Sequence, residues 1–250
     1  MNTAYFRFYE ELNDFLPIEK RKQTLRYHFD GNPGIKDPIE ALGVPHTDVE
    51  LIIVGGNSVG FDYQLQDQDR VAVYPVFESF DITPLVRLRE EPLRKCAFIL
   101  DVNLGKLART LRLLGFDTAY RNDYHDADVV SIGTAEHRTI LTRDRRLLYH
   151  RAITHGYWVR AVDPEQQIQE VLKRFDLYRM IQPFHRCLEC NGIISPVPKQ
   201  QVLDQLEPLT KKYYEEFFRC EECGKVYWKG SHYEHMMKKL WKFTHRQEIQ

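Results

Sequence analysis

Four cysteines in two closely spaced pairs constrain the fold of this chain more than any other feature. Cys187 and Cys190 form one Cys-x-x-Cys pair, and Cys220 and Cys223 form the other. The first residues of the chain lack the basic-then-apolar order of a secretion signal, so the two pairs favour a zinc site with four thiolate ligands over disulfides. The alternatives are two redox-active pairs or surface thiols without a metal.

The sequence around the two pairs predicts a zinc ribbon. Gly192 and Gly224 follow the pairs closely, and a positive φ at these glycines would turn backbone amides toward the sulfur atoms. The spacer between the pairs is longer than the roughly 15 to 20 residues that are usual, so we expect an additional excursion over Ser195 to Tyr214. The ribbon is followed by an apolar helical face made of Tyr233, Met236, Met237, Leu240 and Trp241.

Composition and charge indicate a globular protein with two differently charged parts. The 250 residues are 43% hydrophobic and 28% charged, which excludes disordered and collagen-like classes. Residues 1–90 contain 9 Lys and Arg against 15 Asp and Glu, whereas residues 91–250 contain 26 against 21. The positive charge of the second part is therefore compatible with a nucleic-acid partner. No apolar run approaches the roughly 18 residues of a membrane helix, so we expect a soluble, cytoplasmic protein that binds no membrane.

The first part of the chain has the element order of a small β-grasp sheet. The predicted elements are strands over Ala4–Tyr9 and Tyr27–Phe29, a helix over Lys36–Leu42, and strands over Leu51–Val54 and Val71–Pro75. This order predicts a ubiquitin-like domain over residues 1–80. Gly55 and Gly56 are expected to form a hairpin turn rather than the activated diglycine tail of a sulfur carrier. A binding or scaffolding role toward a protein partner then follows for this domain.

The second part alternates short apolar strands with helices. After a linker predicted over Glu78 to Lys95, the expected strands are 97–100, 116–120, 139–142 and 157–162, and the expected helices are 104–114, 127–136, 145–153 and a last one from Pro164. Such alternation predicts a parallel α/β sheet covered on both faces. We therefore expect an α+β and α/β protein: a β-grasp domain, an α/β domain over residues 95–180, and the zinc ribbon with its helix over residues 181–250.

Acidic side chains follow the predicted parallel strands. Asp101, Asp144 and Asp163 each come at a strand end, and Asp126 or Asp128 opens the helix after the second strand. Because the carboxyl ends of parallel strands share one edge of the sheet, we expect these carboxylates to converge there. Clustered carboxylates need a divalent cation, and Mg²⁺ or Mn²⁺ suits oxygen ligands. Each acid also has a simpler interpretation as a helix N-cap.

Basic residues accompany these acids. Lys106, Arg109 and Arg112 lie at a spacing of three on the polar side of the first predicted helix of the α/β domain, and Arg143 directly precedes Asp144. A metal-binding acidic cluster ringed by cations suits a polyanionic phosphodiester, because arginine forks onto phosphate oxygens. The alternative is that each cation is an ordinary solvated helix residue.

Several segments together resemble one family. They are residues 98–109, 111–118, 140–144, 186–192 and 223–233, with residues 36, 39–46 and 70–75 in the first domain. These segments are similar to the Mut-seven C-terminal (Mut7-C) RNase family and its ubiquitin-like companion domain. The resemblance covers nearly the whole chain and implies a metal-dependent ribonuclease with a PIN-like fold and a zinc ribbon.

The resemblance also implies roles for the acids. In PIN-type nucleases, acids after the first and third strands bind the metal, which corresponds to Asp101 and Asp144. Asp163 fits the place after the fourth strand, and the place on the intervening helix stays open among Asp126, Asp128 and Glu136.

The function that follows is Mg²⁺- or Mn²⁺-dependent hydrolysis of RNA, with Lys106, Arg109, Arg112 and Arg143 on the phosphates and Zn²⁺ in a structural role. The alternative is a non-catalytic RNA-binding or adaptor protein that uses the ribbon and the ubiquitin-like domain. A phosphatase with Asp101 as the nucleophile is disfavoured, because Asn103 stands where that chemistry needs a second Asp.

Overall fold

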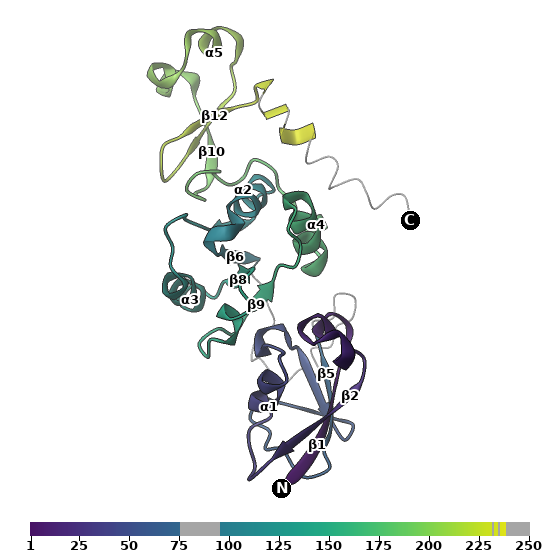
Figure 1. Cartoon of the computed structure of the whole chain (residues 1–250). Helices are drawn as coiled ribbons and strands as arrows, with labels where there is room; N and C mark the ends of the chain where they lie inside the picture. The colour runs from purple at the N-terminus through teal and green to yellow at the C-terminus, as the bar shows by residue number, and fades with distance from the viewer. Residues whose placement is uncertain (76–95, 232, 235, 239–250) are drawn as a thin grey trace. The chain divides into compact units, whose positions relative to one another are not determined.

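The computed structural model describes residues 1–75, 96–231, 233–234 and 236–238 of the chain (Figure 1). The predicted linker over Glu78 to Lys95 lies outside the described residues, as do Leu240 and Trp241 of the predicted C-terminal helical face. The chain divides into two compact units. The first is Met1–Asn103 with Tyr124–Trp158, and the second is Leu104–Asp123 with Val159–Gln250. None of the helices in the described part of the chain has the length and apolar character that crossing a bilayer requires.

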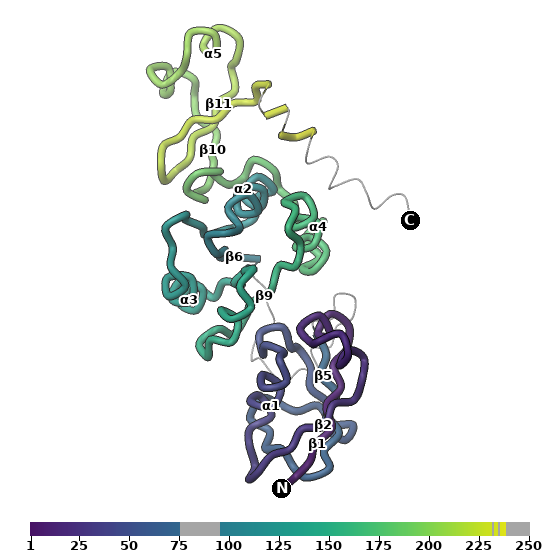
Figure 2. The backbone as a smooth tube through the Cα atoms, in the orientation of Figure 1, coloured from purple at the N-terminus to yellow at the C-terminus, as the bar shows by residue number. Residues whose placement is uncertain are grey.

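The N-terminal sheet has five strands in the order β2-β1-β5-β3-β4. The strands are β1 (Asn2–Phe8), β2 (Thr24–Phe29), β3 (Leu51–Val54), β4 (Asn57–Val59) and β5 (Arg70–Tyr74), and the helix α1 (Lys36–Ala41) precedes β3. β1 and β5 pair in parallel, and the other neighbours pair antiparallel. This is the predicted β-grasp plan, which Figures 1 and 2 show around α1.

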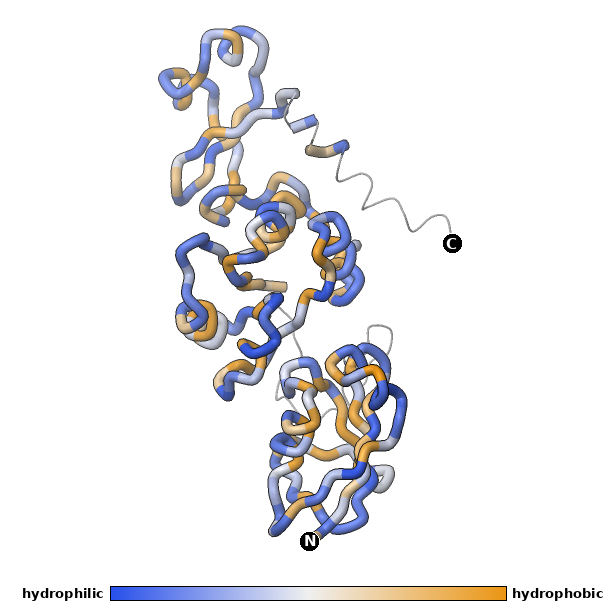
Figure 3. Tube along the Cα trace, viewed as in Figure 1, coloured by the Kyte–Doolittle hydropathy of each residue, from blue (hydrophilic) through white to orange (hydrophobic). Residues whose placement is uncertain are grey.

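Side-chain alternation explains why residues 2–8 form the strand β1, which lies between β2 and β5. Ala4, Phe6 and Phe8 point into the core, whereas Tyr5 and Arg7 between them are less buried. In Figure 3 hydrophobic stretches of the trace gather on the central strands of this sheet.

The glycine pair at residues 55 and 56 forms the predicted hairpin turn. Val54 pairs with Asn57 across the turn, and Gly55 and Gly56 have φ values of 56° and 91°. A two-residue hairpin loop favours a positive φ at both positions, which glycine adopts without a steric penalty. The pair is thus internal to the β3–β4 hairpin.

The α/β part of the first unit contains three parallel strands. β6 (Ala97–Leu100), β8 (Thr139–Thr142) and β9 (Gly156–Trp158) pair in the order β6-β8-β9. Most of their residues are buried, as expected for a parallel sheet that is covered on both faces. The helix α3 (Asp126–Ala135) packs on β6 and β8.

Two predicted elements differ from the structure. The helix expected over 145–153 is a single 3-10 turn, η5 (Leu147–Tyr149), in which backbone amides bond three residues back. The strand expected over 157–162 ends at Trp158. The backbone amides of Arg160 and Ala161 instead donate to the Glu170 carboxylate, each at 2.9 Å, which takes them out of any strand pairing.

The second unit holds two helices of the α/β part and the ribbon. The helices are α2 (Gly105–Leu113) and α4 (Pro164–Arg174), which pack on each other, and the strand β7 (Asp117–Ala119) follows α2. The ribbon strands β10 (Ile194–Val197), β11 (Phe217–Cys220) and β12 (Val226–Trp228) form an antiparallel sheet. Between β10 and β11 lie two 3-10 turns and α5 (Pro208–Tyr213), which accounts for the predicted excursion.

Candidate active site and metal centre

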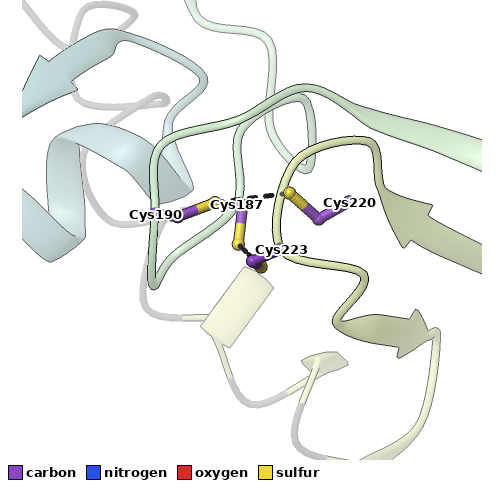
Figure 4. A group of neighbouring side chains, drawn as sticks. All are labelled: Cys187, Cys190, Cys220 and Cys223. Atoms are coloured by element: carbon purple, nitrogen blue, oxygen red, sulfur yellow. Dashed lines mark hydrogen bonds between the residues drawn. The ribbon is translucent and has the colours of Figure 1, made fainter.

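The four cysteines form one compact cluster. Their sulfur atoms all lie within 4.8 Å of one another, and Figure 4 shows them pointing together from two loops. The Sγ atoms of Cys187 and Cys223 are 3.6 Å apart, and those of Cys190 and Cys220 are 3.4 Å apart. Disulfide sulfurs would be about 2 Å apart, whereas tetrahedral Zn–S bonds of about 2.3 Å place sulfurs ~3.8 Å apart. The cluster therefore fits a tetrahedral metal ion.

Local backbone geometry holds each pair of ligands. In the second knuckle Gly224 adopts the predicted positive φ, with a value of 73°. Its amide donates to the carbonyl of Cys220 at 3.1 Å. In the first knuckle the expectation of a positive φ at Gly192 is wrong, because Asn191 takes that conformation with a φ of 73°. Asparagine tolerates the left-handed region. Gly192 is required for space, since a Cβ there would lie 2.9 Å from the sulfur of Cys220.

Hydrogen bonds prepare one of the thiols for metal binding. Burial opposes ionisation of Cys187, but hydrogen bonds from the amides of Cys190 and Glu189 and from the Tyr227 hydroxyl outweigh it and lower its pKa to about 7. The Tyr227 Oη atom lies 3.0 Å from the Cys187 sulfur and accepts from the amide of Leu188 at 3.2 Å. Thiolate is the form that binds metal, so this network favours ligation.

Arg112 ties the first knuckle to α2 and β7 within the second unit. Its side chain is 4% exposed. The guanidinium donates to the carbonyls of Thr118 at 2.9 Å, Tyr120 at 3.1 Å, Leu188 at 3.2 Å and Glu189 at 2.8 Å. The guanidinium N–H groups already donate to carbonyls inside the protein, so this environment does not fit the expected role of Arg112 in phosphate binding. The sequence carried no sign of this role beyond the position of Arg112 on the helix.

Asp101 lies directly after β6, and Asp144 lies shortly after β8, the strand that pairs with β6 in parallel. Asp101 is 4% exposed. Its Oδ1 accepts from the amide of Asn103 at 2.8 Å, and its Oδ2 accepts from the amide of Arg143 at 2.9 Å and from the hydroxyl of Thr142. These donors fix the carboxylate at the end of the strand.

Thr142 links the two acids. Its hydroxyl donates to Asp101, and the same oxygen accepts from the amide of Asp144 at 2.8 Å. The sequence analysis did not single out Thr142, although its place as the last residue of the predicted third strand, two residues before Asp144, was a usable signal. The Asp144 side chain is 43% exposed, and its Oδ1 accepts from the amide of Arg146 at 2.9 Å.

The other predicted acids serve helix ends. The Asp128 carboxylate accepts from the amide of His125 at 2.9 Å, in a capping box at the start of α3. Asp163 accepts from the amides of Glu165 at 3.0 Å and Gln166 at 3.1 Å at the start of α4. Asp126 is exposed in the first turn of α3. Within the described residues, the cysteines are the one group of three or more candidate ligands that the structure brings within 4.8 Å.

The predicted cations differ in their surroundings. Lys106 and Arg109 are exposed on α2. Arg143 is half-buried; it directly precedes Asp144, and its backbone amide donates to Asp101. Exposed cations can meet a phosphate backbone without losing an internal contact.

Comparison with known proteins identifies two families along the chain. Residues 96–240 match the Mut7-C RNAse domain, and residues 1–81 match the Mut7-C ubiquitin domain. Among solved structures, two crystal structures of the small archaeal modifier protein 1 of Haloferax volcanii are similar to part of the chain. One is 14% identical with a TM-score of 0.25, covering 30% of this chain and 98% of that one. The other is 14% identical with a TM-score of 0.26, covering 32% and 100%. No curated protein matches the chain.

The two domain matches agree with the architecture. The ubiquitin match covers the β-grasp sheet, and the RNAse match covers the parallel strands, both acids and the cysteine cluster. An RNAse domain implies a nuclease-type hydrolase with RNA as its substrate. The chain belongs to the Mut7-C RNAse family, with a Mut7-C ubiquitin domain preceding the RNAse domain.

Proposed function

We propose that this protein is a metal-dependent ribonuclease whose catalytic ion is held by Asp101 and Asp144. The observation that carries the proposal is the buried Asp101 carboxylate, fixed by Thr142 at the end of β6 beside the partly exposed Asp144 after β8. A carboxylate held in place by neighbouring donors needs little reorganisation to bind a cation.

The donor set of the two acids suits a hard cation. A carboxylate has about four acceptor positions, and three donors reach Asp101, which leaves one on Oδ1. Oδ2 of Asp144 accepts no hydrogen bond from the part of the chain that the structure describes. Mg²⁺ is commonly bound by one or two carboxylates together with waters and substrate phosphates. Two acids therefore suffice, and among the described residues no third acid, whether Asp126, Asp128 or Glu136, joins them in a group of metal ligands.

Bound Mg²⁺ or Mn²⁺ would lower the pKa of a water for in-line attack on the RNA phosphodiester. Asp101 and Asp144 would hold the ion, and the Thr142 hydroxyl would keep these two residues next to each other. We assign phosphate binding to Lys106, Arg109 and Arg143, and leave Arg112 out because its donors bind carbonyl groups. We also propose that the four cysteines hold a structural Zn²⁺.

A cavity in the second unit supports RNA as the substrate. It has a volume of about 390 Å³, and its lining includes the cations Arg109 and Lys225 with the aromatic residues Tyr214, Tyr227 and Trp228. Aromatic side chains stack on unpaired bases, and nearby cations attract the phosphates of the same strand. The combination favours a single strand over a small apolar ligand.

A non-catalytic RNA-binding adaptor is the second candidate. It is favoured by one observation, that the donors around Asp101 already satisfy most of that carboxylate inside the protein. An adaptor would bind RNA through the same cavity without cutting it.

The decisive experiment is incubation of the purified full chain with mixed RNAs in Mn²⁺, in Mg²⁺ and in chelator. We expect cleavage that the chelator abolishes, and a loss of at least about 100-fold in Asp144→Asn. Asp163→Asn is the matched control, because asparagine still caps α4 and cleavage should persist. RNA binding without cleavage by the wild-type protein under every metal condition would favour the adaptor.

A further inference from the structure

Arg145, the residue after Asp144, reaches the ubiquitin-like domain. Both lie in the first compact unit. The Nη2 atom of Arg145 donates to the carbonyl of Phe15 at 2.8 Å and approaches the carbonyl of Gly43 at 3.5 Å. Its guanidinium also lies 5.1 Å from the ring centre of Phe15 and 5.0 Å from that of Trp158. A guanidinium over two neighbouring rings combines cation–π attraction with its charge-assisted hydrogen bond.

Trp158 completes this contact from the parallel sheet. It ends β9, and its ring lies 5.2 Å from that of Phe15. Trp158 packs against the apolar core of the ubiquitin-like domain. The core of one domain is therefore closed partly by a side chain of the other.

Two more polar contacts follow along the same segment. The Tyr149 hydroxyl donates to the carbonyl of Gly43 at 2.7 Å. The Nε2 atom of His46, in the 3-10 turn η3 (His46–Asp48), lies 2.8 Å from the carbonyl of Ile153. The side chains of Arg145, Tyr149 and His46 thus join residues 145–153 to the ubiquitin-like domain. The segment 145–153 contains one short turn of its own, η5.

The same segment begins at the proposed catalytic acid. On one side, the amide of Asp144 is held by Thr142 at 2.8 Å. On the other, the amides of Arg146 and Leu147 bond to Asp144 at 2.9 Å and 3.2 Å. Arg145, which lies between Asp144 and Arg146, is anchored to Phe15. Asp144 is therefore held between the end of β8 and the ubiquitin-like domain.

We propose that the ubiquitin-like domain serves as a built-in docking partner of the RNAse domain, and that its carbonyls at Phe15 and Gly43 position Asp144 through Arg145. The positioning role rests on the proposed function, whereas the docking contact does not. Arg145 is a positioning residue, because it acts on the metal site through Asp144. The face that binds Arg145 is occupied within the chain, so a protein partner would use another face of the domain.

The test separates docking from catalysis by measuring both in the full chain. Arg145→Gln removes the charge and the stacking, Tyr149→Phe removes one hydroxyl, and Arg151→Gln is the control, an exposed cation in the same segment. Amide hydrogen exchange of residues 143–149, followed by mass spectrometry, reports docking. The Mn²⁺ concentration for half-maximal RNA cleavage reports positioning.

We expect at least about tenfold faster exchange in Arg145→Gln, a smaller rise in Tyr149→Phe and none in Arg151→Gln. The half-maximal Mn²⁺ concentration should rise in the same order, with unchanged zinc content, and Arg145→Lys should restore part of it. Unchanged exchange in Arg145→Gln would overturn the docking contact. Faster exchange in Arg145→Gln with an unchanged Mn²⁺ dependence would overturn the positioning role. If Arg145→Gln exchanges faster but the wild-type protein cuts no RNA, the docking contact stands and the proposed function fails.

Discussion

The hydroxyl of Thr142 donates a hydrogen bond to the Oδ2 atom of Asp101. Through the same oxygen it accepts from the amide of Asp144 at 2.8 Å. One buried hydroxyl thus joins the residues that follow two neighbouring parallel strands. It holds the Asp101 carboxylate next to the backbone of Asp144, the second acid on which the proposed chemistry depends.

Replacing Thr142 by valine keeps the β-branched shape and removes this link. We expect unfolding in urea to show a loss of about 1.5–3 kcal/mol, because a buried carboxylate loses a donor. RNA cleavage should fall more in Thr142→Val than in Thr142→Ser, which retains the hydroxyl. Thr139→Val, at the buried start of the same strand, is the control; an equal loss of cleavage there would contradict a specific role for Thr142.

Removing one cysteine of the cluster should release the metal. Elemental analysis of purified protein should give one zinc per chain in the wild type and far less in Cys187→Ser, with the ribbon unfolded, because ligand loss removes folding free energy of the metal site. Cys96 lies outside the cluster, so the Cys96→Ser protein should have the zinc content of the wild type. Full zinc content in Cys187→Ser would exclude the four-thiolate site.

Arg112 and Arg109 stand one turn apart on α2 and should respond in opposite ways. Arg112→Met leaves four carbonyls without their donor, and we expect a loss of about 3 kcal/mol in the free energy of unfolding. Arg109→Met, at an exposed position, should change stability by less than about 0.5 kcal/mol but weaken RNA binding. Denaturant unfolding and a filter-binding measurement at two salt concentrations would check both. If Arg112→Met binds RNA more weakly but unfolds at the wild-type denaturant concentration, Arg112 binds phosphate after all.

His46 should make the stability of the first unit depend on pH. Its side chain is 5% exposed, and burial together with the charge of Lys36 lowers its pKa, although the carbonyl of Ile153 and the Glu40 carboxylate act in the other direction. The unfolded chain takes up the proton first as the pH falls, because histidine there titrates near 6.5. The contribution is therefore fully present above pH 6.5 and is lost as the pH falls through the lowered pKa.

Urea unfolding between pH 8 and pH 5 would measure this contribution. His46→Gln should flatten the fall in stability below pH 6.5, and His28→Gln, at an exposed position, should not. A wild-type stability that rises as the pH falls from 6.5 would show that the Ile153 carbonyl and Glu40 dominate.

Much of the fold was readable from local patterns. The sequence located five strands of the two sheets closely, namely those at 2–8, 51–54, 70–74, 97–100 and 139–142. Alternation or continuous apolar character marks each of them within its own residues. Helix 145–153 was predicted wrongly from the same kind of signal. Its side chains Arg145 and Tyr149 face the ubiquitin-like domain, and that contact replaces the helix.

The acids illustrate the same division. The sequence placed Asp101 and Asp144 after their strands, but it could not separate them from Asp128 and Asp163, which cap helices. A cap and a metal ligand look alike in sequence, because both are acids between a strand and a helix. Hydrogen-bond partners from distant residues distinguish them.

The sequence by itself determined most strands of the ubiquitin-like domain, its diglycine turn and the two cysteine pairs, because strand periodicity, turn chemistry and Cys-x-x-Cys spacing act over a few neighbouring residues. Only the tertiary structure decided that Arg112 binds carbonyls rather than phosphate, that Thr142 joins two acids and that Arg145 reaches the ubiquitin-like domain. The physical reason is that the role of a polar side chain depends on its burial and on which groups lie within hydrogen-bond distance, and residues far apart in the chain supply those groups.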